Sequence, residues 1–158
     1  MENMLTADNK TQISQPVSAT QITITPIAGS CGAEIGGVDL SRPLSKRTFR
    51  VVEKALLDHL VIFFRGQTLT PNQQKTFARR FGQLRISDQY QPIDGHPEIL
   101  EIVKEPDATG IVGNLWHCDE SFLERPALGS ILYMIECPEY GGDTMFSNQY
   151  VAYEALSL

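Results

Sequence analysis

Residues 116–120 read Trp-His-Cys-Asp-Glu, and the interpretation of the whole chain starts from them. In an extended segment, side chains two positions apart project to the same side, with their Cα atoms about 6.6 Å apart. The imidazole of His117 and the carboxylate of Asp119 could therefore bind one metal ion from the face of a strand. One further His would complete the facial triad of non-heme Fe(II) sites, which leaves coordination positions open. The spacing alone also fits a hydrogen-bonded surface pair, so the flanking sequence has to decide.

The cysteines do not suggest a site of their own. Cys118 lies between the two candidate ligands, and alternation along a strand would turn its thiol to the opposite face. With Cys31 and Cys137 it makes three widely spaced cysteines without a CxxC. An odd number in this pattern indicates neither a disulfide framework nor a structural zinc site, so we expect reduced thiols.

Several further motifs surround the pair in a fixed order. They are Ile-Thr-Pro at 24–26, Gly-Ala-Glu-Ile-Gly-Gly-Val-Asp-Leu at 32–40, Phe-Phe-Arg-Gly-Gln at 63–67, Ala-Arg-Arg-Phe-Gly at 78–82, Arg-Pro-Ala-Leu-Gly-Ser-Ile-Leu at 125–132, Gly-Gly-Asp-Thr at 141–144 and Tyr-Glu-Ala-Leu-Ser at 153–157. Together they resemble the taurine dioxygenase (TauD/TfdA) family over nearly all of the chain after residue 20. A set of ordered motifs is far more specific than any one of them.

This resemblance implies a fold and an activity. The family's fold is a double-stranded β-helix, a jelly roll of the clavaminate synthase-like kind, so the expected class is α+β or mainly β, with the jelly roll incomplete in this chain. The implied activity is that of a dioxygenase that uses Fe(II) and takes 2-oxoglutarate as cosubstrate. His117 and Asp119 would bind the iron. Thr144 matches the position whose hydroxyl donates to the 2-oxoglutarate carboxylate, although the same residues could be a plain Gly-Gly-Asp turn.

Two parts of the family's site have no counterpart here. Its second half supplies a third iron ligand, a His, and an Arg that pairs with the far carboxylate of 2-oxoglutarate. No His follows His117 and no Lys or Arg follows Arg125. His59, near a helix end, and His96, in a turn-like Asp-Gly-His-Pro, are expected to be structural. We therefore expect residues 21–158 to be the N-terminal portion of such a dioxygenase domain, inactive alone, after a disordered arm over residues 1–20.

The substrate positions differ from those of taurine-specific relatives. Those relatives have a His at the end of a Leu-x-Ile-His stretch, where this chain has Ser87. They also have an Asn three residues before the Trp, where this chain has Gly113. Both changes argue against taurine, and they leave a small sulfonate, sulfate ester or carboxylate as the expected substrate, together with O2.

Charge and hydropathy exclude other classes. The net charge of −6 and a pI near 5.0 do not provide the basic stripe that a nucleic-acid surface needs. No stretch approaches the roughly 18 apolar residues of a membrane span, and the polar first twenty residues lack the apolar core of a signal peptide. We expect a cytoplasmic protein without nucleic-acid or membrane partners, and leave open whether it forms a homo-oligomer.

The periodicity predicts the elements on which these motifs lie. Ser45 and Thr70 are expected to cap two helices, the second with Pro71 at its first position. Trp116 is expected to pack, and Arg65, Arg79 and Arg80 to be solvated or structural. The other expected elements are a strand over 22–27, a glycine turn over 29–37, a strand over 60–64 buried on both faces, the end of the second helix at Gly82, strands over 99–103 and 129–135, a loop over 106–114 and the first turn of a helix over 151–156.

Two other functional classes stay open. A non-catalytic fragment could bind a partner through unpaired strand edges. A redox-inert zinc hydrolase is the second, although the chain has no HExxH and no Ser-His-Asp set that the pattern can place.

Overall fold

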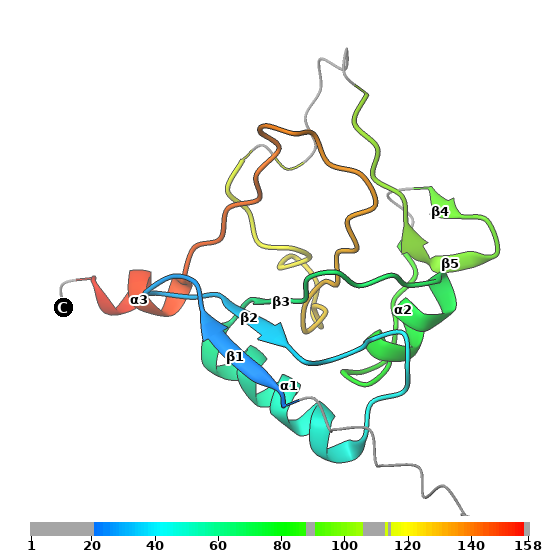
Figure 1. Cartoon of the computed structure of the whole chain (residues 1–158). Coiled ribbons are helices and arrows are strands. Elements are labelled where there is room, and N and C mark those ends of the chain that lie inside the picture. The colour runs from blue at the N-terminus through cyan, green and yellow to red at the C-terminus, as the bar shows by residue number, and fades with distance from the viewer. Residues whose placement is uncertain (1–20, 88–90, 106–112, 114, 157–158) are drawn as a thin grey trace, which may run out of the picture.

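A computed structural model describes residues 21–87, 91–105, 113 and 115–156 (Figure 1). The elements, in chain order, are β1 (Thr23–Pro26), β2 (Ala33–Gly36), α1 (Lys46–His59), β3 (Ile62–Phe63), α2 (Pro71–Ala78), β4 (Pro92–Ile93), β5 (His96–Leu100) and α3 (Gln149–Glu154). The expected mixture of helices and strands is confirmed. The described strands form one three-stranded and one two-stranded sheet, which is less than a double-stranded β-helix. The predicted arm over 1–20 and most of the predicted loop over 106–114 lie outside the described residues.

The larger sheet has the order β1-β2-β3, with β1 and β2 antiparallel and β2 and β3 parallel. Residues 33–36 form β2, so the expectation that the whole glycine cluster is a turn was wrong. Ala33 and Ile35 point into the core, which gives this stretch the alternation of a strand despite its glycines. Gly37 then turns the chain at φ 74°, where a Cβ would collide with the carbonyl oxygen of Gln21.

The two helices begin where the sequence predicts. The Ser45 hydroxyl accepts a hydrogen bond from the Thr48 amide at 3.0 Å and caps α1. Thr70 and Gln73 form a reciprocal capping box at the start of α2, with Pro71 in the first turn. Both caps satisfy amides that have no partner inside the helix, which fixes where each helix starts.

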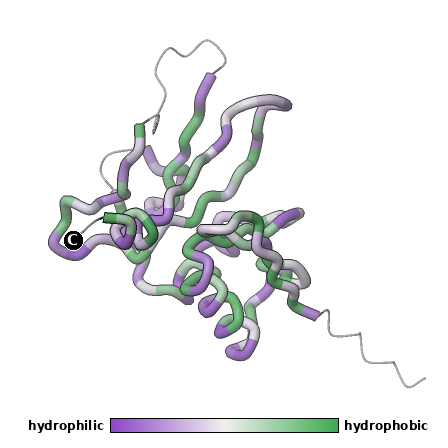
Figure 2. Tube along the Cα trace, turned by 90° about the vertical axis from the view of Figure 1, so that its left-hand side faces the viewer, coloured by the Kyte–Doolittle hydropathy of each residue, from purple (hydrophilic) through white to green (hydrophobic). Residues whose placement is uncertain are grey.

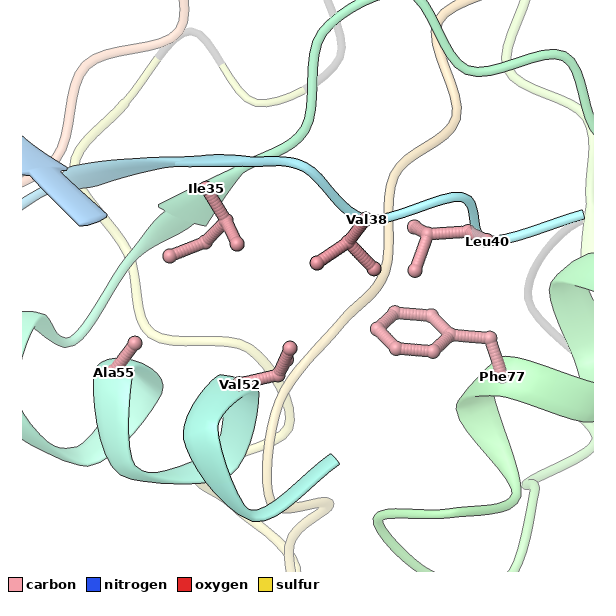
Figure 3. Close-up of a cluster of buried hydrophobic side chains, with 6 residues drawn as sticks. All are labelled: Ile35, Val38, Leu40, Val52, Ala55 and Phe77. Atoms are coloured by element: carbon pink, nitrogen blue, oxygen red, sulfur yellow. The ribbon is translucent and has the colours of Figure 1, made fainter. Parts of the chain in front are cut away.

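The core lies between α1, α2 and the three-stranded sheet, as Figure 3 shows. Val52 is completely buried at its centre, and Phe77 approaches from α2. The cluster of buried hydrophobic residues consists of Ile35, Val38, Leu40, Val52, Ala55 and Phe77. Figure 1 shows α1 along one face of the sheet and the β4–β5 hairpin beside α2, where α2 and β5 are in contact.

Several predicted boundaries were wrong. Helix α2 ends at Ala78 and not at Gly82, because the amides of Arg80 and Phe81 bond three residues back and tighten the chain into turns. Strand β3 covers only Ile62–Phe63, is half-buried and pairs with β2 alone among the described strands. Strand β5 begins at His96, which was expected in a loop, and ends at Leu100 instead of Val103.

The predicted strand over 129–135 is not formed. These residues are described as irregular chain, and no described strand pairs with them. They rest on the N-terminal part through side chains: the Tyr133 hydroxyl accepts from the Leu69 amide at 3.1 Å, and the Gln74 amide group donates to the Ile131 carbonyl at 3.4 Å. An apolar alternation specifies a strand only when a neighbouring backbone is there to pair with it.

The segment then returns to the sheet. The ring of Phe146 packs edge-on against that of Phe63 in β3, with centroids 6.3 Å apart. The Asn148 amide group donates to the Ser30 carbonyl at 2.6 Å, and its oxygen caps α3. A helix was expected from residue 151, and α3 begins two residues earlier for this reason. Among the residues that the structure describes, no helix has the length and apolar character to cross a membrane.

Candidate metal site

His117 and Asp119 lie on an irregular segment and not on the expected strand. Asp119 enters a turn that the Leu123 amide closes by donating to the Glu120 carbonyl at 3.0 Å. Although the strand is absent, the two side chains converge, with His117 Nε2 and Asp119 Oδ1 3.2 Å apart. The expected convergence is therefore present, but it comes from the turn after residue 118.

The ring of His117 is held by its other nitrogen. Nδ1 lies 2.7 Å from the carbonyl oxygen of Leu115, which can only accept a hydrogen bond. A hydrogen bond to this carbonyl requires a proton on Nδ1, and the Nδ1–H tautomer leaves the lone pair of Nε2 free to bind a metal. Metal-binding imidazoles commonly have this arrangement, because the hydrogen bond fixes both the tautomer and the ring orientation.

The carboxylate of Asp119 is held in the same manner. The Ser130 hydroxyl donates to Oδ2 at 2.9 Å, while Oδ1 faces the imidazole. The side chains of His117 and Asp119 keep 55% and 63% of their exposed area, so an ion from solvent can reach both. No described residue makes this pair into a group of three metal-binding side chains.

The spacing of the pair fits a metal ion. With bonds of about 2.1 Å, two ligands at right angles around one ion lie about 3.0 Å apart. The observed 3.2 Å between His117 Nε2 and Asp119 Oδ1 is close to this value. An imidazole nitrogen with a carboxylate oxygen is also a donor set that divalent iron accepts. The same distance fits a hydrogen bond when Nε2 carries a proton as well as Nδ1, so a doubly protonated His117 could close on Asp119 when no ion is bound.

Among the described residues, neither Thr144 nor Cys118 makes a hydrogen bond with this pair. Thr144 is exposed after two glycines with positive φ, Gly141 at 80° and Gly142 at 74°. Cys118 is exposed.

Other predictions can be compared with the structure. Trp116 keeps 68% of its area exposed, so the expectation that it packs was wrong. His59 lies at the helix end as expected, since it is the last residue of α1, and its backbone carbonyl accepts from the Gly32 amide. The arginines have structural partners: Arg65 pairs with Glu34, Arg79 with Glu98, and Arg80 lies over the ring of Phe49 and donates to the Leu44 carbonyl.

Of the two positions that differ from taurine-specific relatives, the structure places Gly113 beside the pair. A Cβ at Gly113 would lie 3.5 Å from Cε1 of His117, so this position adjoins the pair. Ser87 is the last residue of the described stretch 21–87. Two residues earlier, Arg85 reaches the turn after Asp119 and lies 3.0 Å from Glu120.

Sequence reasoning missed three features around the pair: the Leu115 carbonyl, the Ser130 hydroxyl and the Arg85–Glu120 contact. Every residue has a backbone carbonyl, so the sequence cannot indicate that the one of Leu115 binds His117. Ser130 was missed because it was placed in the expected strand over residues 129–135. The charges of Arg85 and Glu120 lie 35 positions apart, so only the folded chain brings them together.

Comparison with known proteins places these observations in a family. The model of the "Taurine catabolism dioxygenase TauD, TfdA family" matches residues 23–158. The chain is 38% identical over 139 residues to an alpha-ketoglutarate-dependent sulfate ester dioxygenase of Pseudomonas putida, covering 87% of this chain and 45% of that protein. It is 37% identical over 137 residues to an alkylsulfatase of Acinetobacter baylyi, and the match covers 86% of this chain and 42% of that protein.

A solved structure, a taurine dioxygenase from Burkholderia xenovorans, aligns with a TM-score of 0.46 and 38% identity over 48% of this chain and 28% of that one. The chain spans roughly half the length of the curated relatives that it matches. The family model covers nearly all of the chain after residue 22, including the residues that form the candidate metal site. The chain therefore belongs to the taurine catabolism dioxygenase TauD/TfdA family.

Proposed function

We propose that this protein is an Fe(II)- and 2-oxoglutarate-dependent dioxygenase that hydroxylates a small organic acid. One observation carries the site: His117 Nε2 lies 3.2 Å from Asp119 Oδ1 while Nδ1 is committed to the Leu115 carbonyl. In this proposal residues 21–158 are the N-terminal portion of the dioxygenase domain and contribute to its jelly roll. Family membership supports this assignment.

Each residue has a defined task in this proposal. The imidazole of His117 and the carboxylate of Asp119 would hold the metal from two adjacent directions, and the Thr144 hydroxyl would donate a hydrogen bond to a carboxylate of 2-oxoglutarate. The bound iron would supply the oxygen chemistry, in which 2-oxoglutarate becomes succinate and carbon dioxide as the substrate is hydroxylated. The exposure of the pair leaves the approach to the metal open for both molecules.

The substrate class follows from relatives and from two positions. One relative is named for sulfate esters, a second is an alkylsulfatase, and a third, from Cupriavidus pinatubonensis, is named for 2,4-dichlorophenoxyacetate. All these compounds carry an anionic group on a small organic body. Because Ser87 and Gly113 differ from the taurine-binding residues, we propose a sulfate ester, sulfonate or carboxylate other than taurine.

The test is metal binding and turnover in the 158-residue chain and in the longest form that its gene encodes. Binding of Co(II), a spectroscopic substitute for Fe(II), should be weakened at least about 100-fold by His117→Ala or Asp119→Ala, because each removes a ligand. Cys118→Ala is the matched control, since Cys118 lies between them and should not contact the metal. Normal Co(II) binding by His117→Ala would overturn the site.

Turnover tests the activity itself. With Fe(II), we expect 2-oxoglutarate-dependent oxygen uptake by the longer form, stimulated by a member of a panel of alkyl sulfates, sulfonates and phenoxyacetates. The 158-residue chain should show little. If the longer form binds the metal but forms no succinate with or without the panel, the proposed activity is wrong even though the metal site stands.

A second candidate function is non-catalytic binding of a protein partner by the 158-residue chain. It is favoured by β1, an edge strand whose four residues are all exposed. Size-exclusion chromatography separates the two functions: a monomer at all concentrations contradicts this candidate, whereas mixed or growing oligomers support it.

A further inference from the structure

The carboxylate of Asp119 is held by residues to which the family comparison assigns no role. Ser130 lies 11 positions away, beyond the turn that follows the pair, and its hydroxyl donates to Oδ2 of Asp119 at 2.9 Å. This bond occupies the oxygen that faces away from His117. It leaves Oδ1 as the oxygen that lies beside Nε2, at 3.2 Å.

The backbone at this point is also unusual. Glu120 follows Asp119 with φ 51°, a left-handed conformation that residues other than glycine seldom adopt. Such a conformation persists only where surrounding contacts enforce it. The bond from the Leu123 amide to the Glu120 carbonyl closes the turn, and the Glu120 side chain supplies a second constraint.

That second constraint is an ion pair with Arg85. Nη1 of Arg85 lies 3.0 Å from Oε2 of Glu120, with side chains that keep 42% and 25% of their exposed area. Oε2 of Glu120 is shielded from solvent and accepts no hydrogen bond from the described residues. The positive charge of Arg85 therefore balances its negative charge. Losing Arg85 would leave this carboxylate oxygen buried without a counter-charge, and the turn would have to open to hydrate it.

We propose that Ser130 and the Arg85–Glu120 pair are positioning residues that hold the Asp119 carboxylate in place for the metal. This inference rests on the proposed metal site and extends it to three residues that would not touch the ion. Ser130 fixes the rotation of the carboxylate, and the ion pair fixes the turn from which it projects. Residues that orient a ligand in this manner commonly change metal affinity about 10- to 100-fold when they are removed.

The experiment measures Co(II) dissociation constants and the visible d–d absorption of the bound Co(II), in the longest form that the gene encodes. Ser130→Ala should weaken Co(II) binding about 10-fold or more and alter the absorption bands, and Ser130→Thr should restore both because it keeps the hydroxyl. Arg85→Ala should act in the same direction. Its absorption change should be reproduced by Glu120→Ala, since either variant breaks the same ion pair.

Matched controls separate positioning from general damage. Ser121→Ala removes an exposed hydroxyl and Arg125→Ala an exposed cation from the same segment, and neither should change Co(II) affinity or absorption. Thermal unfolding midpoints of all variants should stay near that of the parent. If Ser130→Ala and Arg85→Ala bind Co(II) as the parent does while His117→Ala does not, the positioning role is wrong and the metal site stands. If His117→Ala also binds normally, the proposed site itself fails.

Discussion

Residues 115–156 have a higher share of apolar residues than residues 21–87, yet the first region buries its apolar side chains and the second leaves most of them exposed. All the buried hydrophobic residues in the described chain lie between Ala33 and Phe77. In the second region the large apolar side chains are exposed, and Figure 2 shows hydrophobic stretches along its extended loops. They include Leu115, Trp116, Phe122, Leu128, Leu132, Met134, Ile135, Tyr140, Met145, Tyr150 and Tyr153. Burial needs two layers, and only the first region has a helix packed on a sheet.

The two regions also differ in charge. Residues 21–87 contain ten Lys and Arg against four Asp and Glu, whereas residues 115–156 contain one against seven. Ion pairs between Lys75 or Arg79 and Glu98, and between Arg85 and Glu120, each take the cation from the first region. The candidate metal site therefore lies on a segment without its own core, tied by polar contacts to a packed and basic scaffold.

The largest expected difference between the regions is in the cost of losing a phenylalanine. Phe77 keeps 7% of its area exposed and packs edge-on against Phe64 and Phe81, so Phe77→Ala should lower the free energy of unfolding by about 3–5 kcal/mol. Phe122 keeps 72% exposed, and Phe122→Ala should change it by less than about 0.5 kcal/mol. Urea denaturation measures both. Equal losses would show that the second region has a core of its own.

A smaller effect is expected where the regions touch. Tyr133→Phe removes the hydroxyl that accepts from the Leu69 amide, and should lower the free energy of unfolding by about 1 kcal/mol. The Leu69 amide should also exchange its hydrogen faster. Tyr140→Phe is the control, because the Tyr140 side chain is exposed and removing its hydroxyl should not change the free energy of unfolding. Unchanged exchange at Leu69 in Tyr133→Phe would mean that this contact does not join the regions.

A pH-dependent effect is expected at Glu98. A hydrogen bond from Lys75 is the main cause that lowers the pKa of Glu98, assisted by backbone hydrogen bonding and by the charges of Lys75 and Arg79. A lowered folded-state pKa contributes stability above the unfolded-state pKa, and this contribution is lost as the pH falls through the folded-state value. Glu98→Gln should thus lower the thermal unfolding midpoint at pH 7, and its difference from the parent should shrink on acidification to about pH 3.

The control for this prediction is Glu139→Gln, which neutralises an exposed carboxylate outside the ion pairs that the structure describes. It should leave the unfolding midpoint nearly unchanged at every pH. A constant difference between Glu98→Gln and the parent across the whole pH range would show that packing, and not charge, holds α2 to β5.

The smallest effect is expected in the exposed segment. Ile135 keeps 86% of its area exposed, so Ile135→Ser should change the free energy of unfolding by less than about 0.5 kcal/mol. The same variant should bind less of the dye ANS, because it removes apolar surface from contact with water. A loss above 1 kcal/mol would mean that Ile135 is buried in solution, against a second layer or another molecule.

Local sequence patterns predicted the parts of the fold that local physics controls. The caps at Ser45 and Thr70 are present because each depends on residues within a few positions of one another. Two predictions failed because they depended on which backbone segments meet: β2 was not expected, and a strand expected over residues 129–135 has no partner among the described strands. The alternation of side chains along a segment does not say which segment it will pair with.

The same division holds at the candidate site. The sequence by itself determined that His117 and Asp119 are two positions apart in a TauD/TfdA chain, because family membership and spacing are properties of residue order. Only the tertiary structure decided how they converge, through a left-handed turn at Glu120, and which groups hold them. The Ser130 hydroxyl reaches Asp119 and the Arg85 guanidinium reaches Glu120 through space, and such contacts depend on distance in the folded chain and not on distance along it.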